Sequence, residues 1–366
     1  MAKKAFNLIE WFHQKIKEEK ATIDYLSDKL FNLTEEIKKG LNELKDDSHH
    51  LVPIINGLHG DEMEKKGHPA LVKMSVRFKS RDIPPGKIKD FIDLKKHGGK
   101  LILFLHGLMN DETIWQSEKK DTLKRLGTFI ESQNKANVLY IRYNTGRHIS
   151  ENGRNLSCLL ELIEDLYEND IVEINIIAHS MGGLVTRSAG HYATVLNHNW
   201  IKKLKKVFLI GVPNDGSYLA RTAYMAQYFL RKLDPTKHDE YARLFDIRSN
   251  GIKDLSFGFM VDEDWMDPLF EKQKSRKATK IYPLTGVDYY LIAATVADQN
   301  QKNKFFTFFG DGLVEKESAL SNLFKENVVD SGYIHFGYFP EENHLTLLES
   351  EKVQEYLLKG LEWKIL

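Results

Sequence analysis

The stretch that decides the fold is Ile174-Asn175-Ile176-Ile177-Ala178-His179-Ser180-Met181-Gly182-Gly183. Its apolar, β-branched first half is typical of a buried strand, and a helical pattern begins at Leu184. A serine at such a junction is typical of a nucleophile elbow, a strained turn that holds the hydroxyl above a sheet. Ala178 and Gly182 are small, as the near contact of strand and helix requires. We therefore predict that Ser180 is a nucleophile, although Ala178 replaces the first glycine of G-x-S-x-G.

An elbow serine needs a histidine as its base, and the acid and the histidine follow the serine along the chain. Two histidines, His335 and His344, follow Asp311. His335 lies inside the strand-like run 333–339, which would hold its side chain to one face of a sheet. His344 comes after this run, in a loop that can bring an imidazole over the sheet to the serine. We expect His344 to be the base, with His335 as the alternative.

Three aspartates compete for the role of the acid that orients the histidine. Asp311 is flanked by Gly310 and Gly312, which suit a sharp turn that directs a carboxylate toward an imidazole. The same tripeptide is also typical of an ordinary hairpin turn. Asp215 and Asp298 each follow an apolar, strand-like run. We expect Asp311 to be the acid and keep Asp215, and then Asp298, as alternatives.

The apolar run 101–105, followed by His106 and Gly107, predicts a strand buried on both faces and a sharp turn after it. The amide of Leu108, next in the chain, would pair with the amide of Met181 to bind a developing oxyanion. One such donor contributes roughly 2.7–4 kcal/mol in the transition state. We expect His106 to be mainly structural, and we keep His106 and Gly107 as tentative substrate contacts.

Strand-like and helical patterns alternate through the first half of the main domain, residues 51–366. Strands are expected at 72–78, 101–105, 138–141 and 172–177, and helices around 113–133 and 151–168. The first of these strands reads as antiparallel, and the others predict a mainly parallel central sheet with helices on both faces, an α/β fold. Catalytic groups then collect at the carboxyl ends of the strands.

The alternation breaks within residues 215–280, which are rich in aromatic side chains. We interpret this segment as a cap or lid insertion whose aromatics mainly form its own core. Phe257, Phe259 and Met260 are the better candidates for lining a substrate pocket. His148, at the carboxyl end of a predicted strand, is expected to stabilise its loop rather than to contact substrate.

The segment 1–50 differs from the rest of the chain, because apolar residues recur every seven positions within residues 5–46. They are Ile9, Ile16, Ile23, Leu30, Ile37 and Leu44. This pattern predicts an amphipathic helical extension that packs on the main domain. Self-association and peripheral membrane contact are the alternatives, and the interleaved glutamates oppose the second.

The composition of the chain limits the classes of protein and of ligand that we expect. The 366 residues carry 52 basic and 52 acidic side chains, so bulk attraction to nucleic acid is not expected. The one cysteine, Cys158, cannot form an internal disulfide, and we expect it to be a small buried side chain in a helix. We find no signal peptide and no apolar run of ~18 residues, and we expect a cytoplasmic protein. Neither a metal-ligand pattern nor a phosphate-binding loop occurs, so no metal and no cofactor is expected.

The order strand, His-Gly, elbow serine, Gly-Asp-Gly and late histidine resembles that of the α/β-hydrolase superfamily, in particular its lipases with an A-H-S-M-G-G elbow. Further stretches resemble a bacterial branch related to GPI inositol deacylases: 52–61, 142–153, 248–255 and 310–314. The resemblance spans roughly residues 51–360 and implies the α/β-hydrolase fold, with Ser180, Asp311 and His344 as a catalytic triad. Departures from the family pattern at 211–215 and 315–316 mark a divergent member.

The resemblance also implies a serine ester hydrolase mechanism, but it implies no substrate. From the residues we expect a serine carboxylic ester hydrolase that works through an acyl-enzyme on a small-molecule or lipid acyl ester. The aromatic insertion favours a lipid-like acyl group. A thioesterase or amidase with the same triad is an alternative, and so is a non-catalytic binding or scaffold protein on a hydrolase fold.

Overall fold

The computed structural model describes most of the main domain. The described residues are 51–78, 81–117, 124–167, 170–216, 249–266, 278–295, 324, 333–340 and 342–363. The predicted helical extension 5–46, the aspartates at 298 and 311, and much of the 215–280 insertion lie outside these residues.

The centre of the protein is an eight-stranded sheet with the order β2-β1-β4-β3-β5-β6-β7-β8. Its strands are β1 (Ser75–Phe78), β2 (Arg81–Ile83), β3 (Lys100–Leu105), β4 (Asn137–Arg142), β5 (Glu173–His179), β6 (Leu204–Ile210), β7 (Asp288–Thr295) and β8 (Ile334–Pro340). The strands from β4 to β8 pair in parallel, and β1 runs antiparallel to both of its neighbours. The predicted mainly parallel sheet with an early antiparallel strand is therefore confirmed.

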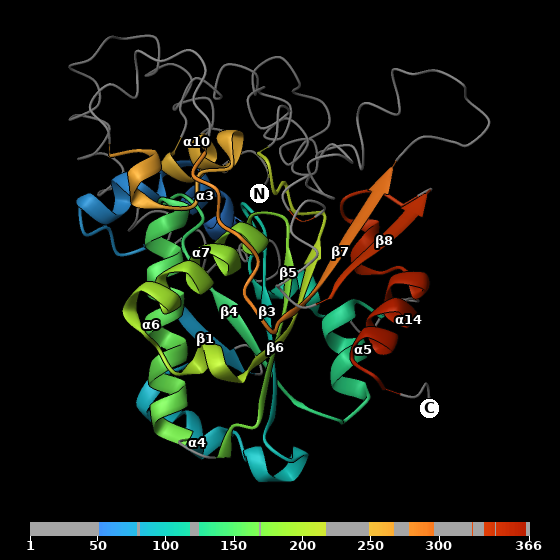
Figure 1. Cartoon of the computed structure of the whole chain (residues 1–366). Coiled ribbons are helices and arrows are strands. Elements are labelled where there is room, and N and C mark those ends of the chain that lie inside the picture. Colours follow the sequence, from blue (N-terminus) through green and yellow to red (C-terminus); the bar gives the residue numbers. More distant parts are fainter. Residues whose placement is uncertain are drawn as a thin grey trace, which may run out of the picture.

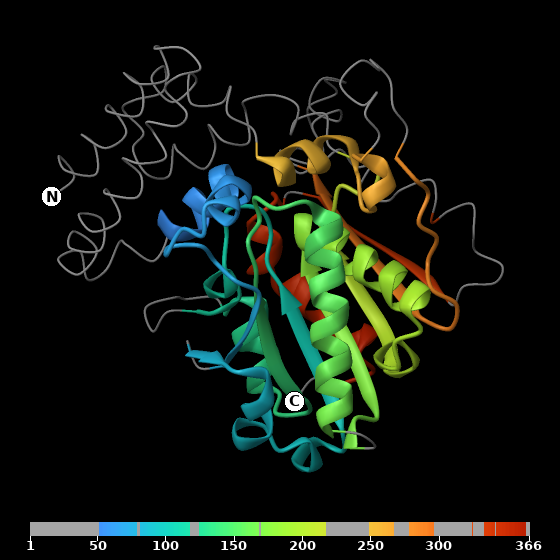
Figure 2. The same ribbon diagram turned by 90° about the vertical axis from the view of Figure 1, so that its left-hand side faces the viewer.

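Helices cover both faces of this sheet. The described residues form the following α-helices: α3 (Leu51–Lys65), α4 (Ile88–Phe91), α5 (Leu126–Ser132), α6 (Ile149–Tyr167), α7 (Met181–Leu196), α10 (Asn250–Phe257) and α14 (Glu351–Gly360). The helices α6 and α7 lie on one face, and α5 and α14 lie on the other (Figure 1). In Figure 2, α6 and α7 run side by side in front of the strands.

The strand β3 shows why the core divides into two layers. Successive side chains of a strand point to opposite faces, and β3 is apolar at every position after Lys100. Its odd-numbered leucines join the cluster that contains residues of α6 and α7, whereas Ile102 and Phe104 join the cluster with residues of α5 and α14. A strand buried on both faces must be apolar throughout. This explains the uninterrupted run that the sequence shows here.

A third group of elements lies above the carboxyl ends of the strands, where α3 and α10 pack together (Figure 1). Ser249 donates from Oγ to the carbonyl of Gly57 at 2.6 Å, and the amide of Gly251 donates to the carbonyl of Gly146 at 3.1 Å. The amide of Ile149 donates to Asp254 Oδ2 at 2.9 Å. Thus the stretches 52–61, 142–153 and 248–255 meet in one layer.

Two expectations about α6 and the segment before β4 need correction. Cys158 is exposed, not buried. The buried face of α6 is formed by Leu156, Leu160 and Ile163, and the helical period turns Cys158 to the other side. The helix expected around 113–133 consists, within its described parts, of a 3-10 turn at Glu112–Trp115 and of α5.

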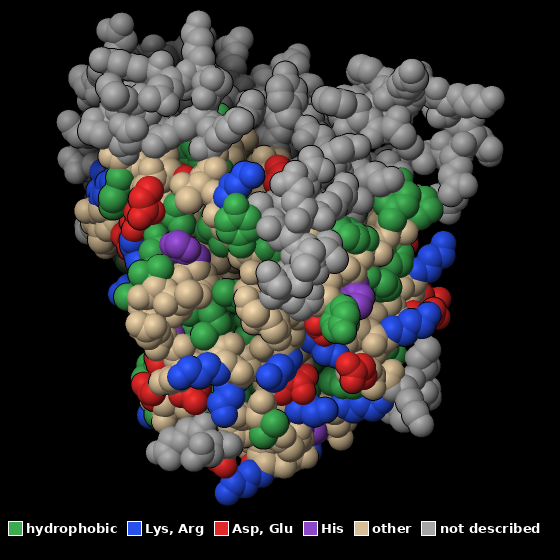
Figure 3. Space-filling view, viewed as in Figure 1, with side chains coloured by type: hydrophobic (Ala, Val, Ile, Leu, Met, Phe, Trp, Pro, Cys, Tyr) green, Lys and Arg blue, Asp and Glu red, His purple; other side chains and the backbone are tan. Residues whose placement is uncertain are grey.

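The surface agrees with the balanced composition. In Figure 3, Lys and Arg side chains alternate with Asp and Glu side chains over the lower part of the visible face. None of the described helices is both long enough and apolar enough to cross a membrane.

The contact between α6 and α7 depends on a glycine. A Cβ at Gly153 would lie 2.5 Å from Ser188 Cβ and 3.0 Å from the Ser188 carbonyl carbon, so α7 would have to move. We predict that Gly153→Ala lowers the free energy of unfolding by about 1–3 kcal/mol, even though alanine favours helix. Urea denaturation measures this. Gly86→Ala is the control, because nothing lies within 4 Å of its added Cβ. A Gly153→Ala protein as stable as wild type would contradict this packing.

Candidate active site

Ser180 lies at the turn between β5 and α7, near the middle of the sheet. Its backbone has φ 52° and ψ −127°, which a residue with a side chain rarely adopts and which costs of order 1–3 kcal/mol. Two hydrogen bonds hold the turn: the Ser180 amide donates to the carbonyl of Ile210 at 2.9 Å, and the Gly183 amide donates to the Ser180 carbonyl at 3.0 Å. This is the strained strand-to-helix turn that the sequence predicts.

The turn after β3 approaches the Ser180 turn so closely that only glycine fits at two positions. A Cβ at Gly107 would lie 2.9 Å from Ser180 Cβ, and a Cβ at Gly182 would lie 2.5 Å from the carbonyl oxygen of His106. The two turns are therefore in direct backbone contact. Gly107, predicted as a tentative substrate contact, lies beside the serine.

Two amides at this contact have no hydrogen-bond partner among the residues that the structure describes. No described residue accepts a hydrogen bond from the amide of Leu108 or from that of Met181. The amide of Met109, by contrast, donates to Oγ1 of the buried Thr145 at 3.1 Å, and Met109 has a left-handed φ of 57°. Thr145, which the sequence did not single out, thus fixes the backbone next to Leu108.

His344 lies in the turn that follows β8 and is buried, with 3% of its surface exposed. Its ring centroid is 4.4 Å from that of His179, the residue before Ser180. The amides of Leu345 and Thr346 donate to Oδ1 of Asn343 at 2.9 and 3.0 Å, which fixes the turn. The structure therefore brings His344 next to the Ser180 turn.

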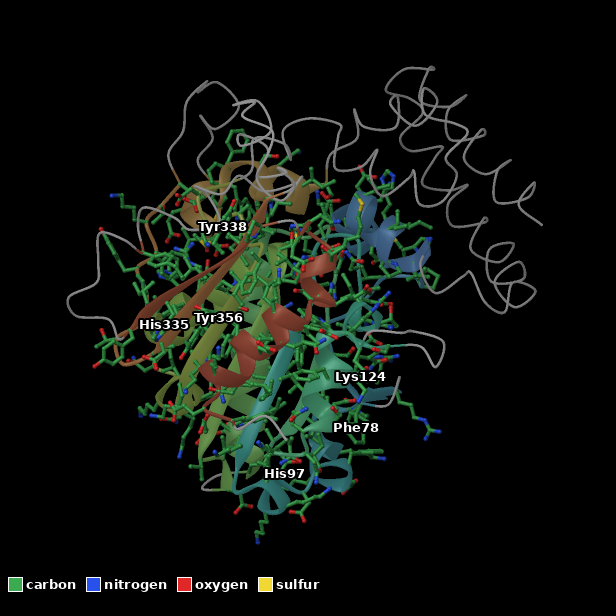
Figure 4. The ribbon with its side chains drawn as sticks, turned by 90° about the vertical axis from the view of Figure 1, so that its right-hand side faces the viewer. Phe78, His97, Lys124, His335, Tyr338 and Tyr356 are labelled. Atoms are coloured by element: carbon green, nitrogen blue, oxygen red, sulfur yellow. The ribbon has the colours of Figure 1, made fainter. Side chains whose placement is uncertain are left out.

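The alternative histidine, His335, lies elsewhere. It is part of β8 and stacks on the ring of Tyr290 at 4.4 Å between centroids. β6 and β7 separate β8 from β5, and at about 4.8 Å per strand this alone puts His335 roughly 14 Å from the serine strand. In Figure 4, His335 lies near Tyr356, farther down β8 than Tyr338. His335 therefore does not belong to the site.

Of the candidate acids, Asp215 is the one within the described residues. It follows β6 and is exposed. Next to it, Asn214 accepts a hydrogen bond at its Oδ1 from Nη1 of the buried Arg187 at 3.1 Å. Nη2 of Arg187 donates to the carbonyl of Ile281 at 2.7 Å. One guanidinium thus holds the chain at both ends of the 215–280 insertion. The assignment of Asp311 as the acid stays a prediction.

The contacts of His106 are those of a structural residue, and its tentative assignment as a substrate contact stays a prediction. It is fully buried and its ring stacks on that of Tyr143, with 4.4 Å between centroids. Its Nε2 faces the amide N–H of Tyr143 at 3.3 Å and must accept, so Nδ1 carries the proton and donates to the carbonyl of Gly107 at 3.0 Å. The Tyr143 hydroxyl donates to the His106 carbonyl at 2.7 Å. Both ring nitrogens are used, and the residue holds the turn at Gly107.

A buried charge cluster anchors the segment after Leu108. Glu112, 1% exposed, accepts from Nε of Arg77 at 2.8 Å and from Nε of Arg142 at 2.6 Å. Arg142 also donates to Asp111 at 3.2 Å. The two arginines come from neighbouring strands, β1 and β4. Sequence reasoning missed this cluster, because its members are far apart in the chain.

The residues proposed to line a pocket are mostly packed inside the protein. Phe259 is 1% exposed and stacks on the half-buried Phe257 at 5.1 Å between centroids. Met260 belongs to the main core, and its carbonyl accepts a hydrogen bond from Ser188 Oγ at 2.6 Å. Phe259 and Met260 therefore serve as core in the described part of the insertion, and Phe257 is the one with accessible surface.

His148 joins the start of α6 to α10. Its Nδ1 lies 3.0 Å from Oδ2 of the buried Asp254, and its ring stacks on Trp265 at 3.7 Å between centroids. This is the loop-stabilising role that we expected for His148. Within the described residues, no cluster of His, Cys, Asp and Glu could hold a metal ion.

The sheet order, the antiparallel β1 and the strained serine turn after the central β5 define an α/β-hydrolase fold. Residues 74–236 match a family described as a domain of unknown function (DUF7379). No curated protein matches the chain at a significant level.

Several solved structures are similar to the chain at low identity. The mature lipase BlEst2 of Bacillus licheniformis is 16% identical, with 73% of this chain and 93% of that chain covered and a TM-score of 0.43. Phospholipase PlaB of Legionella pneumophila is 16% identical, with coverages of 73% and 60% and a TM-score of 0.46. The RedJ thioesterase of Streptomyces coelicolor is 12% identical, with coverages of 74% and 91% and a TM-score of 0.41. At this level the likenesses carry no argument about activity.

The buried histidines of the site predict how stability depends on pH. Burial lowers the pKa of both His106 and His179 from the ordinary 6.5. Below that pH the unfolded chain binds protons that the folded chain does not, so the free energy of unfolding falls as pH falls. The loss is at most about 1.4 kcal/mol per pH unit for each histidine.

Urea denaturation at about pH 7.5 and about pH 5.5 measures this loss. We predict that His179→Gln, which cannot titrate, loses less stability over this interval than wild type. His191→Gln, at a half-buried position, is the control. Equal losses for wild type and His179→Gln would contradict the prediction.

Proposed function

We propose that the protein is a serine hydrolase that cleaves carboxylic esters through an acyl-enzyme. One observation carries this proposal: the strained Ser180 turn lies against both the turn of Gly107 and the histidine turn of His344. A nucleophile, a base and unpaired amides are needed together at one point for acyl transfer. The alternative of a non-catalytic scaffold has no comparable support, because a scaffold does not need backbone strain at a serine.

In the proposed mechanism, Ser180 Oγ attacks the ester carbonyl while His344 accepts its proton. The Leu108 and Met181 amides stabilise the oxyanion of the tetrahedral intermediate. His344 then returns the proton to the leaving alcohol, and the acyl group stays on Ser180. Water, activated by the same imidazole, releases the acid. Asp311 orients the imidazole and stabilises its cation.

We propose a lipid-like acyl ester as the substrate. The aromatic composition of residues 215–280 supports an apolar acyl pocket, since burying each methylene contributes about 0.8 kcal/mol. The same groups could also cleave a thioester or an amide.

The nucleophile can be tested directly. We predict that a fluorophosphonate probe labels wild-type protein at Ser180, because the oxyanion donors bind the phosphonyl oxygen as they would a tetrahedral intermediate. Peptide mass spectrometry locates the adduct. Ser180→Ala should lose the label and the hydrolysis of p-nitrophenyl butyrate. Ser188→Ala is the control, since that serine lies two turns farther along α7. Equal labelling of wild type and Ser180→Ala would show that the nucleophile is wrong.

The acid is tested by separate substitutions. We predict that Asp311→Asn lowers kcat by about 10⁴-fold, because a neutral partner leaves the histidine in the wrong tautomer. Asp215→Asn should change kcat little. Both are measured with p-nitrophenyl butyrate. A collapse with Asp215→Asn alone would move the acid to the loop after β6.

The acyl group is tested with a series of p-nitrophenyl esters. We predict that kcat/KM rises from the two-carbon ester to acyl chains of about six to eight carbons, because each buried methylene adds binding energy in the transition state. A thioester and an amide of the preferred acyl group serve as comparison substrates. A steep fall beyond acetate would instead indicate a short-chain esterase, with the aromatics as core of the insertion.

A further inference from the structure

The histidine before the nucleophile, His179, has contacts that the proposed mechanism does not use. It is the last residue of β5 and is 1% exposed. A position of this kind in a buried strand is usually apolar, and the rest of β5 from Ile176 to Ala178 is apolar. A buried imidazole is costly unless its nitrogens have partners. Its contacts therefore indicate what it does.

The first contact joins His179 to the histidine turn. Its Nε2 lies 2.9 Å from the backbone carbonyl oxygen of His344. A carbonyl can only accept, so Nε2 carries the proton and donates. The ring of His344 also packs on the ring of His179, with 4.4 Å between centroids and 47° between planes. Thus one side chain holds both the backbone and the ring of His344.

The second contact joins the same ring to the turn after β3. The proton on Nε2 leaves Nδ1 as an acceptor, and a Cβ at Gly107 would come within 3.2 Å of this nitrogen. The ring of Trp115, from the same loop, meets the His179 ring edge-on at 6.3 Å. Within the described part of the chain, neither Nδ1 of His179 nor Nε1 of Trp115 has a hydrogen-bond partner.

We infer that His179 is a positioning residue: its Nε2–H, donated to the carbonyl of His344, holds the histidine turn in register with the Ser180 turn and the turn of Gly107. The inference rests on the proposed function, in which His344 is the base. Burial lowers the pKa of His179 well below its usual value, so the ring stays neutral and Nδ1 remains an acceptor. His106 and His344 are the titratable groups that face this ring.

The test compares variants that keep or remove the donor. In His179→Gln the amide nitrogen can reach the place of Nε2 and donate to the same carbonyl. In His179→Leu the volume is filled, but no donor remains. His198→Leu is the control, because its ring bonds to Ser157 at the far end of α7, away from the serine turn.

We expect His179→Leu to lower kcat for p-nitrophenyl butyrate by about 10- to 100-fold with KM within about twofold of wild type, because a misplaced base slows the chemical step. His179→Gln should recover most of the wild-type kcat, and His198→Leu should match wild type. A merely structural role would lower the amount of folded protein in both His179 variants and leave kcat per folded molecule unchanged.

Hydrogen–deuterium exchange of a peptide covering residues 342–350 gives a readout that does not need activity. We expect faster exchange in His179→Leu and wild-type exchange in His179→Gln. If wild type neither hydrolyses esters nor binds the probe, the proposed function fails, and exchange alone decides the inference. If His179→Leu does not fold, His179→Gln decides it: wild-type kcat and exchange support the inference, and loss of either overturns it. Wild-type kcat and exchange in a folded His179→Leu also overturn it.

Discussion

The rest of the site depends on the backbone of Ser180, which is held at a positive φ with a side chain present. Such a conformation persists only when its surroundings determine it. Here β5, β6 and α7 each contribute, through the hydrogen bond from Ser180 to Ile210 and the first turn of α7. The glycines at 107 and 182 let a second backbone pack against the turn. A side chain at either position would force these two turns apart.

Several buried polar groups hold the loops around this turn in place. His106 and Tyr143 fix the turn at Gly107, and Thr145 holds the amide of Met109. The Glu112 cluster anchors the continuation of that loop to β1 and β4. Each of these groups would be costly to bury alone, and each is bonded to a partner from another element. The buried polar groups thus hold in place the loops around the Ser180 turn, which contain little regular structure of their own.

Most of the fold could be predicted from the sequence. A strand that is buried on both faces needs apolar side chains at successive positions, and such continuous apolar runs are visible in the sequence. The predicted runs at 101–105, 138–141 and 172–177 correspond to the strands β3, β4 and β5. The helix α3 could not be predicted in the same way. Gly57 lowers its helix propensity, yet a Cβ there would come 2.5 Å from Cγ of Met109, so a packing contact far along the chain requires this glycine.

The site was predictable where a local turn defines it and not where distant residues meet. The strain at Ser180 follows from a strand, a small residue and a helix in sequence, and the loop position of His344 follows from its place after a strand. The roles of His106 and His179 depend on which carbonyl each imidazole reaches. Glu112 needs two arginines from separate strands. The spacing of residues along the sequence does not give the distances between atoms of residues that are far apart in the chain. The predicted acid lies outside the described residues.

The hydrogen bonds of the Arg187 guanidinium limit how the 215–280 segment of this protein can be exchanged. It binds the chain at Asn214, before the 215–280 insertion, and at Ile281, after it. The distance between the two attachment points is therefore set by α7, which belongs to the body of the domain. An exchanged segment must therefore begin and end at these points, and it must also keep the contacts that Ser249, Asp254 and Met260 make with the body of the domain. Under the proposed function, the two ends of the segment that would select a substrate are thus fixed by the helix that follows the proposed nucleophile.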